Sequence, residues 1–364
     1  MNYSQYKNMK NNNIKKNLNF IVPIIILSAL SILNMYGASY IGNLYKNIWI
    51  RQLAWICISA IAFIIIYKID TRFLYSKSSI FYIIGVISLI LVLFLGRTIN
   101  GASSWFKIGP ISFQPSEIFK MFYILFISYI ISKNKNKDVS LLIKVLFLSF
   151  IPCILIFLEP DTGVVIMYLL MMFGMIAVSK IKKRYIISFL LVALMLGGLF
   201  FSCYFFKKDL FIKFFGTSFF YRMDRLISFK NNTSYQLNNA LIGVGSSGLF
   251  GFGLKSNKIY IPEITTDFVF DLTIINFGYL VGILVIILYC YILISLLKKI
   301  SKCNNAFNKT VLSGVFAMMF FQVFEHIFMN LGLTPITGIT LPFLSYGGSS
   351  FLSYAMLFAL VVKT

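Results

Sequence analysis

Long apolar runs, each of a length suited to crossing a lipid bilayer, recur along the whole chain and restrict its fold more than any other feature. They cover residues 18–38, 51–68, 77–96, 117–133, 141–158, 163–179, 185–206, 266–294, 308–330 and 346–362. Because 59% of the residues are hydrophobic and only 12% are charged, a water-soluble domain could not bury this much apolar surface. The chain is therefore predicted to be an all-α, polytopic membrane protein with about ten transmembrane helices. A basic N-terminal arm at 1–17 precedes a single domain at 18–364.

Basic residues gather in short clusters between these runs, as in the segment from Lys180 to Arg184. The chain has 33 Lys and Arg against 11 Asp and Glu, a balance also found in proteins that bind nucleic acid. The clusters lie on alternate connections, however, as in membrane proteins whose cytoplasmic loops are positive. We therefore expect membrane lipids and no nucleic acid as partners. The same pattern predicts cytoplasmic N- and C-termini and a large extracytoplasmic loop, 207–265, between helices 7 and 8.

The outer connection before the fourth run contains glycines, a proline and the aromatic residue Trp105. These breakers predict a structured loop without regular secondary structure. Trp105 either anchors the loop at the membrane interface or belongs to a site. Glu117 and Lys120 are three residues apart and can pair on one face of the helix that follows. Such a pair is either functional or a clamp between helices.

Two further outer segments carry acidic residues. Asp161 follows Glu159 and Pro160, and it can bind a metal, shape a site or simply cap the sixth helix. Asp267 stands at the end of the 207–265 loop, where we expect the outer mouth of the eighth helix. It is either the N-cap of that helix or a carboxylate of a site.

Polar and small residues in the last third of the chain suggest where a ligand could bind. Arg222 and Arg225 precede a glycine-rich run at 243–253, and guanidinium groups beside exposed amides suit a diphosphate. Residues 332–350 hold so many Gly, Pro, Ser and Thr that irregular backbone is expected near the membrane, lining a cavity. For His326 in the ninth helix we favour interhelical hydrogen bonding over catalysis.

Taken together, these motifs resemble the SEDS family, the shape, elongation, division and sporulation proteins typified by RodA and FtsW. The resemblance runs through most of the chain. The matching positions are Asn100-Gly101-Ala102 with Trp105, Gln114-Pro115-Ser116-Glu117 with Lys120, Pro160-Asp161 with Gly163, Arg225, Tyr235-Gln236, Thr266-Asp267-Phe268 and the stretch from Pro335 to Ser350.

The resemblance implies a ten-helix peptidoglycan glycosyltransferase of the bacterial cytoplasmic membrane, acting in cell elongation, division or sporulation. Its implied substrate is lipid II, and its implied partner is a class B penicillin-binding protein. The family relies on an outer-loop aspartate that matches Asp267 and on a tryptophan that matches Trp105. The chain departs from the family at three places, where Ser104 replaces an arginine, His326 replaces an asparagine, and Ile275-Asn276 stand where an acidic residue is usual.

On this reading, one lipid II supplies a sugar hydroxyl that attacks the anomeric carbon of a polyprenyl-diphosphate-linked chain. Asp267 is predicted to be the general base, or else to hold a divalent cation, Mg²⁺ or Mn²⁺, as the only cofactor considered. The remaining predicted residues bind substrate (Trp105, Lys213, Arg222, Arg225, Gln236, Ser345 and Ser349) or support the site (Glu117, Lys120 and Asp161). Two alternatives stay open, a flippase for lipid-linked precursors and a noncatalytic scaffold for the penicillin-binding protein.

Overall fold

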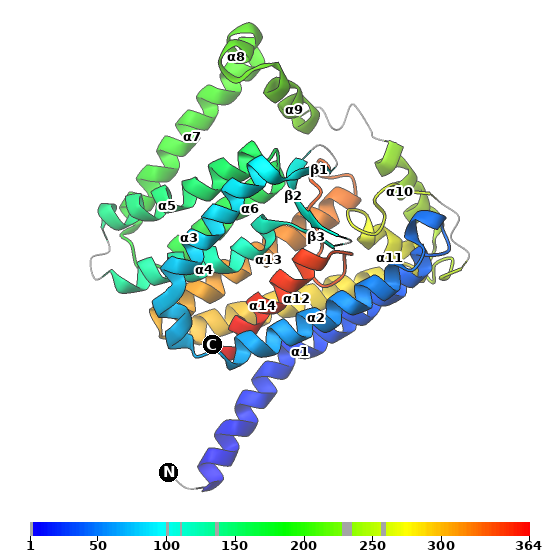
Figure 1. Ribbon diagram of the computed structural model, residues 1–364, viewed down its shortest axis with the longest axis horizontal. Helices are drawn as coiled ribbons and strands as arrows, with labels where there is room; N and C mark the ends of the chain where they lie inside the picture. Colours follow the sequence, from blue (N-terminus) through cyan, green and yellow to red (C-terminus); the bar gives the residue numbers. More distant parts are fainter. Residues whose placement is uncertain (1–2, 100–101, 110, 135–137, 228–234, 256–259) are drawn as a thin grey trace.

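The structure is a computed structural model of the whole chain. It describes residues 3–99, 102–109, 111–134, 138–227, 235–255 and 260–364. The chain forms a bundle of long helices, with a small group of strands and shorter helices at one end of the bundle (Figure 1). Helix α1, Tyr3–Ala38, is continuous from the predicted basic arm into the first apolar run.

The predicted apolar runs correspond to helices throughout the described part of the chain. They are α1, α2 (Ile48–Lys68), α3 (Thr71–Leu95), α4 (Pro115–Lys133), α5 (Val139–Leu158), α6 (Thr162–Ala177), α7 (Lys183–Phe206), α12 (Tyr279–Lys302), α13 (Ala306–Asn330) and α14 (Gly348–Lys363). Eight of these are long and apolar enough to cross a membrane, and α6 and α14 are shorter apolar helices. Isoleucine, leucine and phenylalanine side chains cover much of the outer surface of α2, α3 and α5, as expected where a helix faces lipid. The all-α, multi-pass prediction is confirmed.

The eighth predicted helix, 266–294, is wrong in its boundaries. The chain forms a short helix α11, Val269–Phe277, and then the spanning helix α12. Gly278 separates them with a φ of 84°, and a Cβ there would lie 2.1 Å from the backbone oxygen of Leu249. The break therefore needs glycine, both for its left-handed conformation and for the close approach of another backbone segment. The pattern of hydrophobic residues did not reveal this break, because both helices are apolar.

The connection between α3 and α4 contains regular secondary structure, which corrects the prediction of a loop without any. It contains three antiparallel strands in the order β1 (Arg97–Ile99), β2 (Ala102–Ile108) and β3 (Ile111–Phe113). Phe106 pairs with Phe113, and Arg97 pairs with Trp105. Gly109 has a φ of 60°, so this breaker forms the turn between β2 and β3 and does not interrupt a strand.

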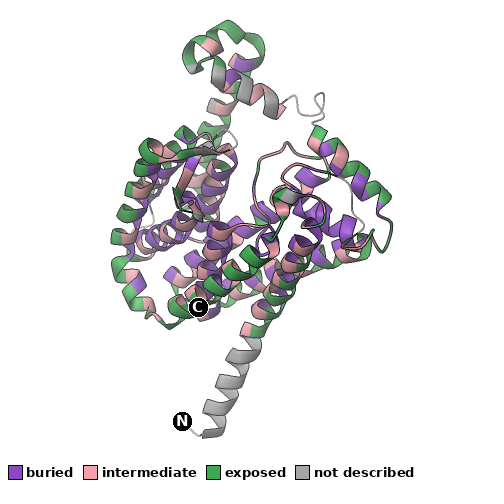
Figure 2. Cartoon of the chain, turned by 45° about the vertical axis from the view of Figure 1, so that its right-hand side comes forward, coloured by how far each residue is buried: buried purple, intermediate pink, exposed green. Residues whose placement is uncertain are grey.

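Helices α4 and α13 form the centre of the bundle. Buried residues concentrate along them, whereas the outer helices are buried on one side (Figure 2). α13 packs against α6 and α4, and α14 packs against α2. Many of the buried side chains on α4, α13 and α14 are polar, including Lys120, Gln322 and Ser353. Polar side chains of these three helices thus meet inside the protein, where buried polar groups need partners.

Helices make up much of the described part of segment 207–265. It contains α8 (Lys208–Phe215), α9 (Thr217–Ile227) and α10 (Tyr235–Ser246). Tyr204 of α7, Phe211 of α8 and Phe220 of α9 form a small aromatic cluster of their own, and α7 to α9 stand apart from the central helices in Figure 1. The glycine-rich run predicted at 243–253 begins inside α10 and continues as turns with positive φ at Gly248, Gly251 and Gly253.

Candidate active site

Asp267 lies in a compact turn just before α11. Its backbone amide donates to the carbonyl of Glu263 at 3.0 Å, and the Thr266 hydroxyl donates to the Glu263 carboxylate at 3.1 Å. Ile264 and Phe268, on either side, have no exposed surface, so apolar burial holds the turn in place. The side chain of Asp267 itself is partly exposed. It does not cap α11, because Phe268 occupies the N-cap position without a side-chain cap.

The side chain of Asn330, at the end of α13, holds this turn in place. The Asn330 amide donates to the carbonyl of Asp267 at 2.8 Å and to the carbonyl of His326 at 2.9 Å. Its oxygen accepts from the backbone amide of Asp271 at 3.2 Å. Asn330 is fully buried, and it joins the aspartate to the end of a spanning helix. It was not among the predicted residues, and the sequence marks it only by its place at the end of the ninth run, four residues after His326.

The irregular segment 331–347 covers the turn from the other side. Tyr346 donates its backbone amide to the carbonyl of Thr265, and the Ser345 hydroxyl donates to the carbonyl of Thr266, both at 2.8 Å. Gly338 of this segment has a φ of 71°, and a Cβ there would lie 3.8 Å from Oδ2 of Asp267. The expectation of irregular backbone at 332–350 is therefore confirmed up to Gly347, after which α14 begins.

On its opposite side the same segment lies against Gly163, in the first turn of α6 and two residues after Asp161. A Cβ at Gly163 would lie 3.2 Å from the carbonyl oxygen of Thr337. Asp161 caps α6, which was one of the predicted roles, by accepting from the amide of Val164 at 3.2 Å. It also accepts from the Gln114 side chain at 3.1 Å. The strip 337–339 thus runs between the start of α6 and the carboxylate of Asp267.

Glu117 and Lys120 form the predicted pair inside the bundle. The Lys120 ammonium donates to the Glu117 carboxylate at 2.6 Å, and both side chains are buried. The ammonium also lies 5.4 Å from the centre of the Tyr354 ring, a cation–π contact. The Tyr354 hydroxyl and the Thr340 hydroxyl are 2.8 Å apart. The ion pair is thereby linked, through α14, to the segment that covers Asp267.

Glu325 and His326 also bond to this segment and not to each other. Thr337 donates its hydroxyl to the Glu325 carboxylate at 3.2 Å. The Nδ1 of His326 lies 2.7 Å from the carbonyl oxygen of Ile339. The favoured prediction of hydrogen bonding for His326 is confirmed, with the partner in an irregular segment and not in a second helix.

Three carboxyls at this end of the bundle have pKa values raised well above their ordinary range. Burial, together with the charge of Glu263, raises the pKa of Asp267 to about 7, although a hydrogen bond from Thr266 acts in the opposite direction. Burial likewise raises the pKa of Asp161 to about 6. Burial and then the charge of Asp161 raise the pKa of Glu159 to about 8. A carboxyl with a pKa near 7 can both accept and release a proton at neutral pH.

The other predicted substrate-binding residues are spread more widely. Trp105 lies partly buried in β2, Lys213 is exposed on α8, and Gln236 is partly buried on α10. Within the described side chains, no hydrogen bond or ion pair joins any of the three to Asp267. Arg222 and Arg225 lie on α9, but their side chains fall outside the described part of the structure.

Two predicted substrate-binding serines use their hydroxyls within the protein. The Ser345 hydroxyl accepts from the amide of Leu341 at 2.8 Å, besides its bond to Thr266. The Ser349 hydroxyl accepts from the amide of Gln114 at 3.1 Å. Both serines are buried, so their observed contribution is to hold the backbone around the site.

The predicted divalent cation would need carboxylate ligands near Asp267. Among the described residues there is no group of three or more His, Cys, Asp and Glu that could hold a metal ion. Glu263 and Asp267 together provide two carboxylates on one turn. Mg²⁺ is often bound by one or two carboxylates together with substrate phosphates, so this donor set fits a cation shared with a diphosphate.

A family model and several related sequences agree on the family to which this chain is similar. A family model for cell cycle proteins, FTSW_RODA_SPOVE, matches residues 15–364. The chain is 30% identical to a probable peptidoglycan glycosyltransferase FtsW of Wigglesworthia glossinidia brevipalpis, over 94% of this chain and 90% of that protein. It is 29% identical to the peptidoglycan glycosyltransferase MrdB of Helicobacter pylori, over 94% and 87%. It is also 29% identical to the stage V sporulation protein E of Bacillus subtilis, over 91% of each.

Solved structures show the same fold. A chain of a peptidoglycan synthase complex, described as coordinating polymerization and crosslinking, superposes with a TM-score of 0.76 at 24% identity, over 93% of this chain and 96% of that one. The rod shape determining protein RodA of Thermus thermophilus superposes with a TM-score of 0.70 at 24% identity, over 95% of each chain.

Proposed function

This chain belongs to the FtsW, RodA and SpoVE family of cell cycle proteins and is a peptidoglycan glycosyltransferase, and we propose that Asp267 is its catalytic base. One observation carries the assignment of Asp267. Asp267 keeps some exposed surface, burial raises the pKa of its carboxyl to about 7, the carboxylate lies next to Gly338, and Asn330 fixes its backbone. A carboxylate held in this way stays in position, and its pKa lies close to the pH at which it must accept a proton.

The proposed reaction joins two lipid-linked sugars. A hydroxyl of the acceptor lipid II attacks the anomeric carbon of the polyprenyl-diphosphate-linked glycan and loses its proton to Asp267. A C–O bond forms between the sugars, and the bond from the anomeric carbon to the diphosphate oxygen breaks. The diphosphate leaves with the electron pair, and Asp267 later releases its proton to water. At neutral pH about half of a carboxyl with a pKa of about 7 is ionised and ready to accept.

The leaving diphosphate needs positive charge, which basic residues of the 207–265 segment can supply. We assign this role to Arg222, Arg225 and Lys213, since guanidinium and ammonium groups stabilise charge that develops as the bond breaks. Trp105 and Gln236 are assigned to the sugar groove, where an aromatic ring and an amide suit a carbohydrate. These residues lie on β2, α8, α9 and α10, so substrate would have to bring these elements together around Asp267.

In the alternative role, in which Asp267 binds a divalent cation (Mg²⁺ or Mn²⁺) and is not the base, Glu263 and Asp267 are the carboxylates that would hold the ion. Such an ion would neutralise charge on the diphosphate oxygens. The protein's own residues then bind and orient the acceptor sugar.

Family membership supports the proposed substrate and partner, and the charge pattern supports the proposed orientation. The proposed substrate is lipid II, and the proposed partner is a class B penicillin-binding protein, in line with the similarity to a chain of a peptidoglycan synthase complex. Both termini are placed in the cytoplasm and Asp267 on the outer face of the cytoplasmic membrane, because basic clusters such as 180–184 then lie inside.

Polymerisation of lipid II by the purified protein tests the proposal. The variant Asp267→Asn keeps the shape of the side chain, and the hydrogen bond from Asn330 goes to the backbone, so the fold should be unchanged. We expect a loss of at least 100-fold in polymerisation. Asp209→Asn, on the exposed surface of α8, is the matched control and should retain full activity.

Full activity of Asp267→Asn would contradict the assignment of the base. Transfer of lipid II across liposomes without glycan synthesis by the unaltered protein would instead support the flippase alternative.

A further inference from the structure

A pocket of about 300 Å³ lies at the end of α4 that is distant from the candidate active site. It is lined by Tyr129, Ile130, Lys133, Asn134 and Lys144. α4 begins next to Asp161 and ends at Lys133, and its 19 residues span roughly 28 Å. The pocket and the site around Asp267 therefore lie at opposite faces of the membrane-spanning bundle.

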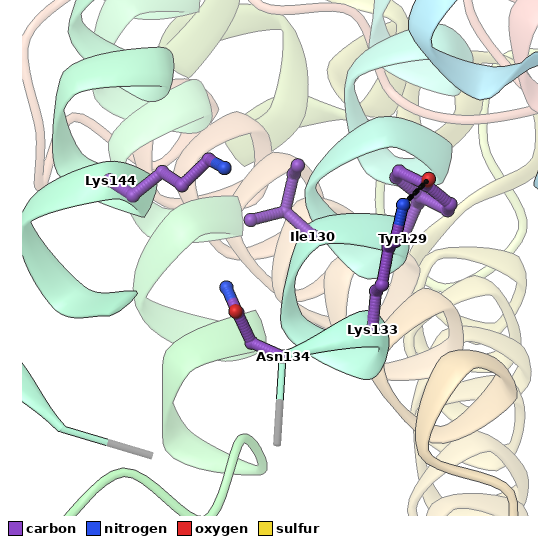
Figure 3. A pocket seen from close by; sticks show the side chains of 5 residues that line it. All are labelled: Tyr129, Ile130, Lys133, Asn134 and Lys144. Atoms are coloured by element: carbon purple, nitrogen blue, oxygen red, sulfur yellow. Dashed lines mark hydrogen bonds between the residues drawn. The ribbon is translucent and has the colours of Figure 1, made fainter. Parts of the chain in front are cut away.

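The pocket gathers positive charge and hydrogen-bond donors from two helices. Lys133 and Asn134 come from the end of α4, and Lys144 reaches toward them from α5 (Figure 3). The Lys133 ammonium lies 2.8 Å from the Tyr129 hydroxyl, which keeps this charge at the pocket wall. No carboxylate lines the pocket, and neither lysine forms an ion pair within the described residues. The nearby Asp138 is used as the N-cap of α5, where it accepts from Leu141.

The wall of the pocket is held by aromatic packing. Tyr129 lies edge-on to Tyr75, with 4.8 Å between ring centres, and Tyr75 in turn packs against Phe307 of α13. The ring of Tyr129 is thus held against α3, which in turn packs against α13, and the same ring supports Lys133 at 5.2 Å. Two exposed ammonium groups, one amide and one hydroxyl around a cavity form a suitable receptor for a phosphate group.

The surface beside the pocket is apolar and faces outward. On α5, Ile143 and Phe147 are 60% and 67% exposed, and they stand next to Lys144 and one turn beyond it. A ligand that carries a phosphate in the pocket could therefore lay hydrocarbon against α5. Free inorganic phosphate has no use for such a surface, whereas a phospholipid covers it with an acyl chain.

We infer that this pocket binds the phosphate headgroup of an anionic phospholipid in the leaflet opposite the active site. Basic pockets between spanning helices recognise such headgroups. The lysines neutralise the phosphate, Asn134 donates to its oxygens, and the acyl chains follow the exposed face of α5. The inference does not depend on the identity of the catalytic base.

Native mass spectrometry of the purified full-length protein with phosphatidylglycerol tests this site. We expect the double variant Lys133→Gln/Lys144→Gln to bind the lipid about 30-fold more weakly, roughly fivefold for each lysine. The control variant Lys68→Gln/Lys77→Gln removes two exposed lysines from the ends of α2 and α3 on the same side, and should bind nearly as well as the unaltered protein. All four lysines are outside the core, so folding is not at issue, and a thermal melt verifies this.

Three outcomes would overturn the inference. Equal losses in the two double variants would mean that net charge alone attracts the lipid. Unchanged binding in Lys133→Gln/Lys144→Gln would place the lipid elsewhere. Displacement of the lipid by inorganic phosphate at the same concentration would assign the pocket to a soluble anion.

Discussion

The amide of Asn330 donates a hydrogen bond of 2.8 Å to the backbone carbonyl of Asp267. The same side chain accepts from the amide of Asp271, so one buried residue holds the backbone on both sides of the α11 start. The carboxylate of Asp267 is left unrestrained by this contact. Its chemistry and its position can therefore be altered separately by mutation.

Asn330→Ala should impair catalysis without changing the base itself. Removing the amide leaves buried backbone groups without partners, which we expect to cost about 3 kcal/mol of folding stability. Displacement of Asp267 should lower kcat by roughly 10- to 100-fold with little change in KM. Asn305→Ala, at the other end of α13, removes a cap bond to Asn308 and should cost about 1 kcal/mol with normal kcat. A parallel fall in both kcat values would argue against a positioning role.

The pH dependence of polymerisation should follow the Asp267 carboxyl. With a pKa of about 7, the ionised fraction rises about tenfold between pH 6 and pH 8, and the initial rate should rise with it. Glu263→Gln removes a charge that raises this pKa, so the rise should move to lower pH. An unchanged profile in Glu263→Gln would mean that another group controls the rate.

The same pKa predicts how stability varies with pH. The pKa of Asp267 is raised from its ordinary value of 3.8, so between these values the folded protein binds more protons than the unfolded chain. Stability should then fall as pH rises from about 4 toward about 7. Thermal melts in detergent should show a smaller decline for Asp267→Asn than for the unaltered protein.

Gly338 should be needed next to the carboxylate as well as for its backbone conformation. Gly338→Ala places a methyl group 3.8 Å from Oδ2 of Asp267 and forces φ of 71° on alanine, at a cost of roughly 1–2 kcal/mol. Gly248→Ala meets the same backbone problem, with φ of 63° and nothing within 4 Å. Both variants should lose similar stability, and only Gly338→Ala should lose polymerisation activity.

Removing one charge of the buried ion pair between Glu117 and Lys120 should lower the free energy of unfolding more than removing both. Glu117→Gln leaves a fully buried ammonium without its partner, which we expect to destabilise the protein by about 3–5 kcal/mol. The double variant Glu117→Gln/Lys120→Met removes both charges and should recover most of that loss. Equal melting temperatures for the single and double variants would contradict this.

Much of the fold was predictable because lipid imposes a strong pattern. Bilayer-spanning apolar runs and the placement of basic residues predicted the multi-pass helical bundle, and the three-residue spacing of Glu117 and Lys120 predicted their contact. Local signals were less reliable where breakers occur at the ends of strands or helices. Gly109 suggested an irregular loop but forms a hairpin turn, and Gly278 went unnoticed inside an apolar run although it divides the eighth helix.

The site was only partly predictable, for a different reason. Asp267, Asp161 and the irregular segment could be recognised because polar residues and breakers stand out among apolar ones. The contacts that organise them join residues far apart in the chain, such as Asn330 with Asp267, or residues of different elements, such as Thr337 with Glu325. Neither Asn330 nor Thr337 carries a local pattern that reveals its partner, because the pairing arises from how α13 and the last irregular segment pack.

The break at Gly278 allows α11 and α12 to be oriented independently, which a single continuous helix would not allow. The length and tilt of α12 must match the thickness of the lipid layer, whereas α11 follows the turn that carries Asp267, the proposed base. Because the chain turns at a residue without a side chain and α11 rests against Leu249, the orientation of the short helix is set by its protein neighbours. In a thicker or thinner membrane, α12 can therefore be longer or more tilted while Asp267 keeps its position.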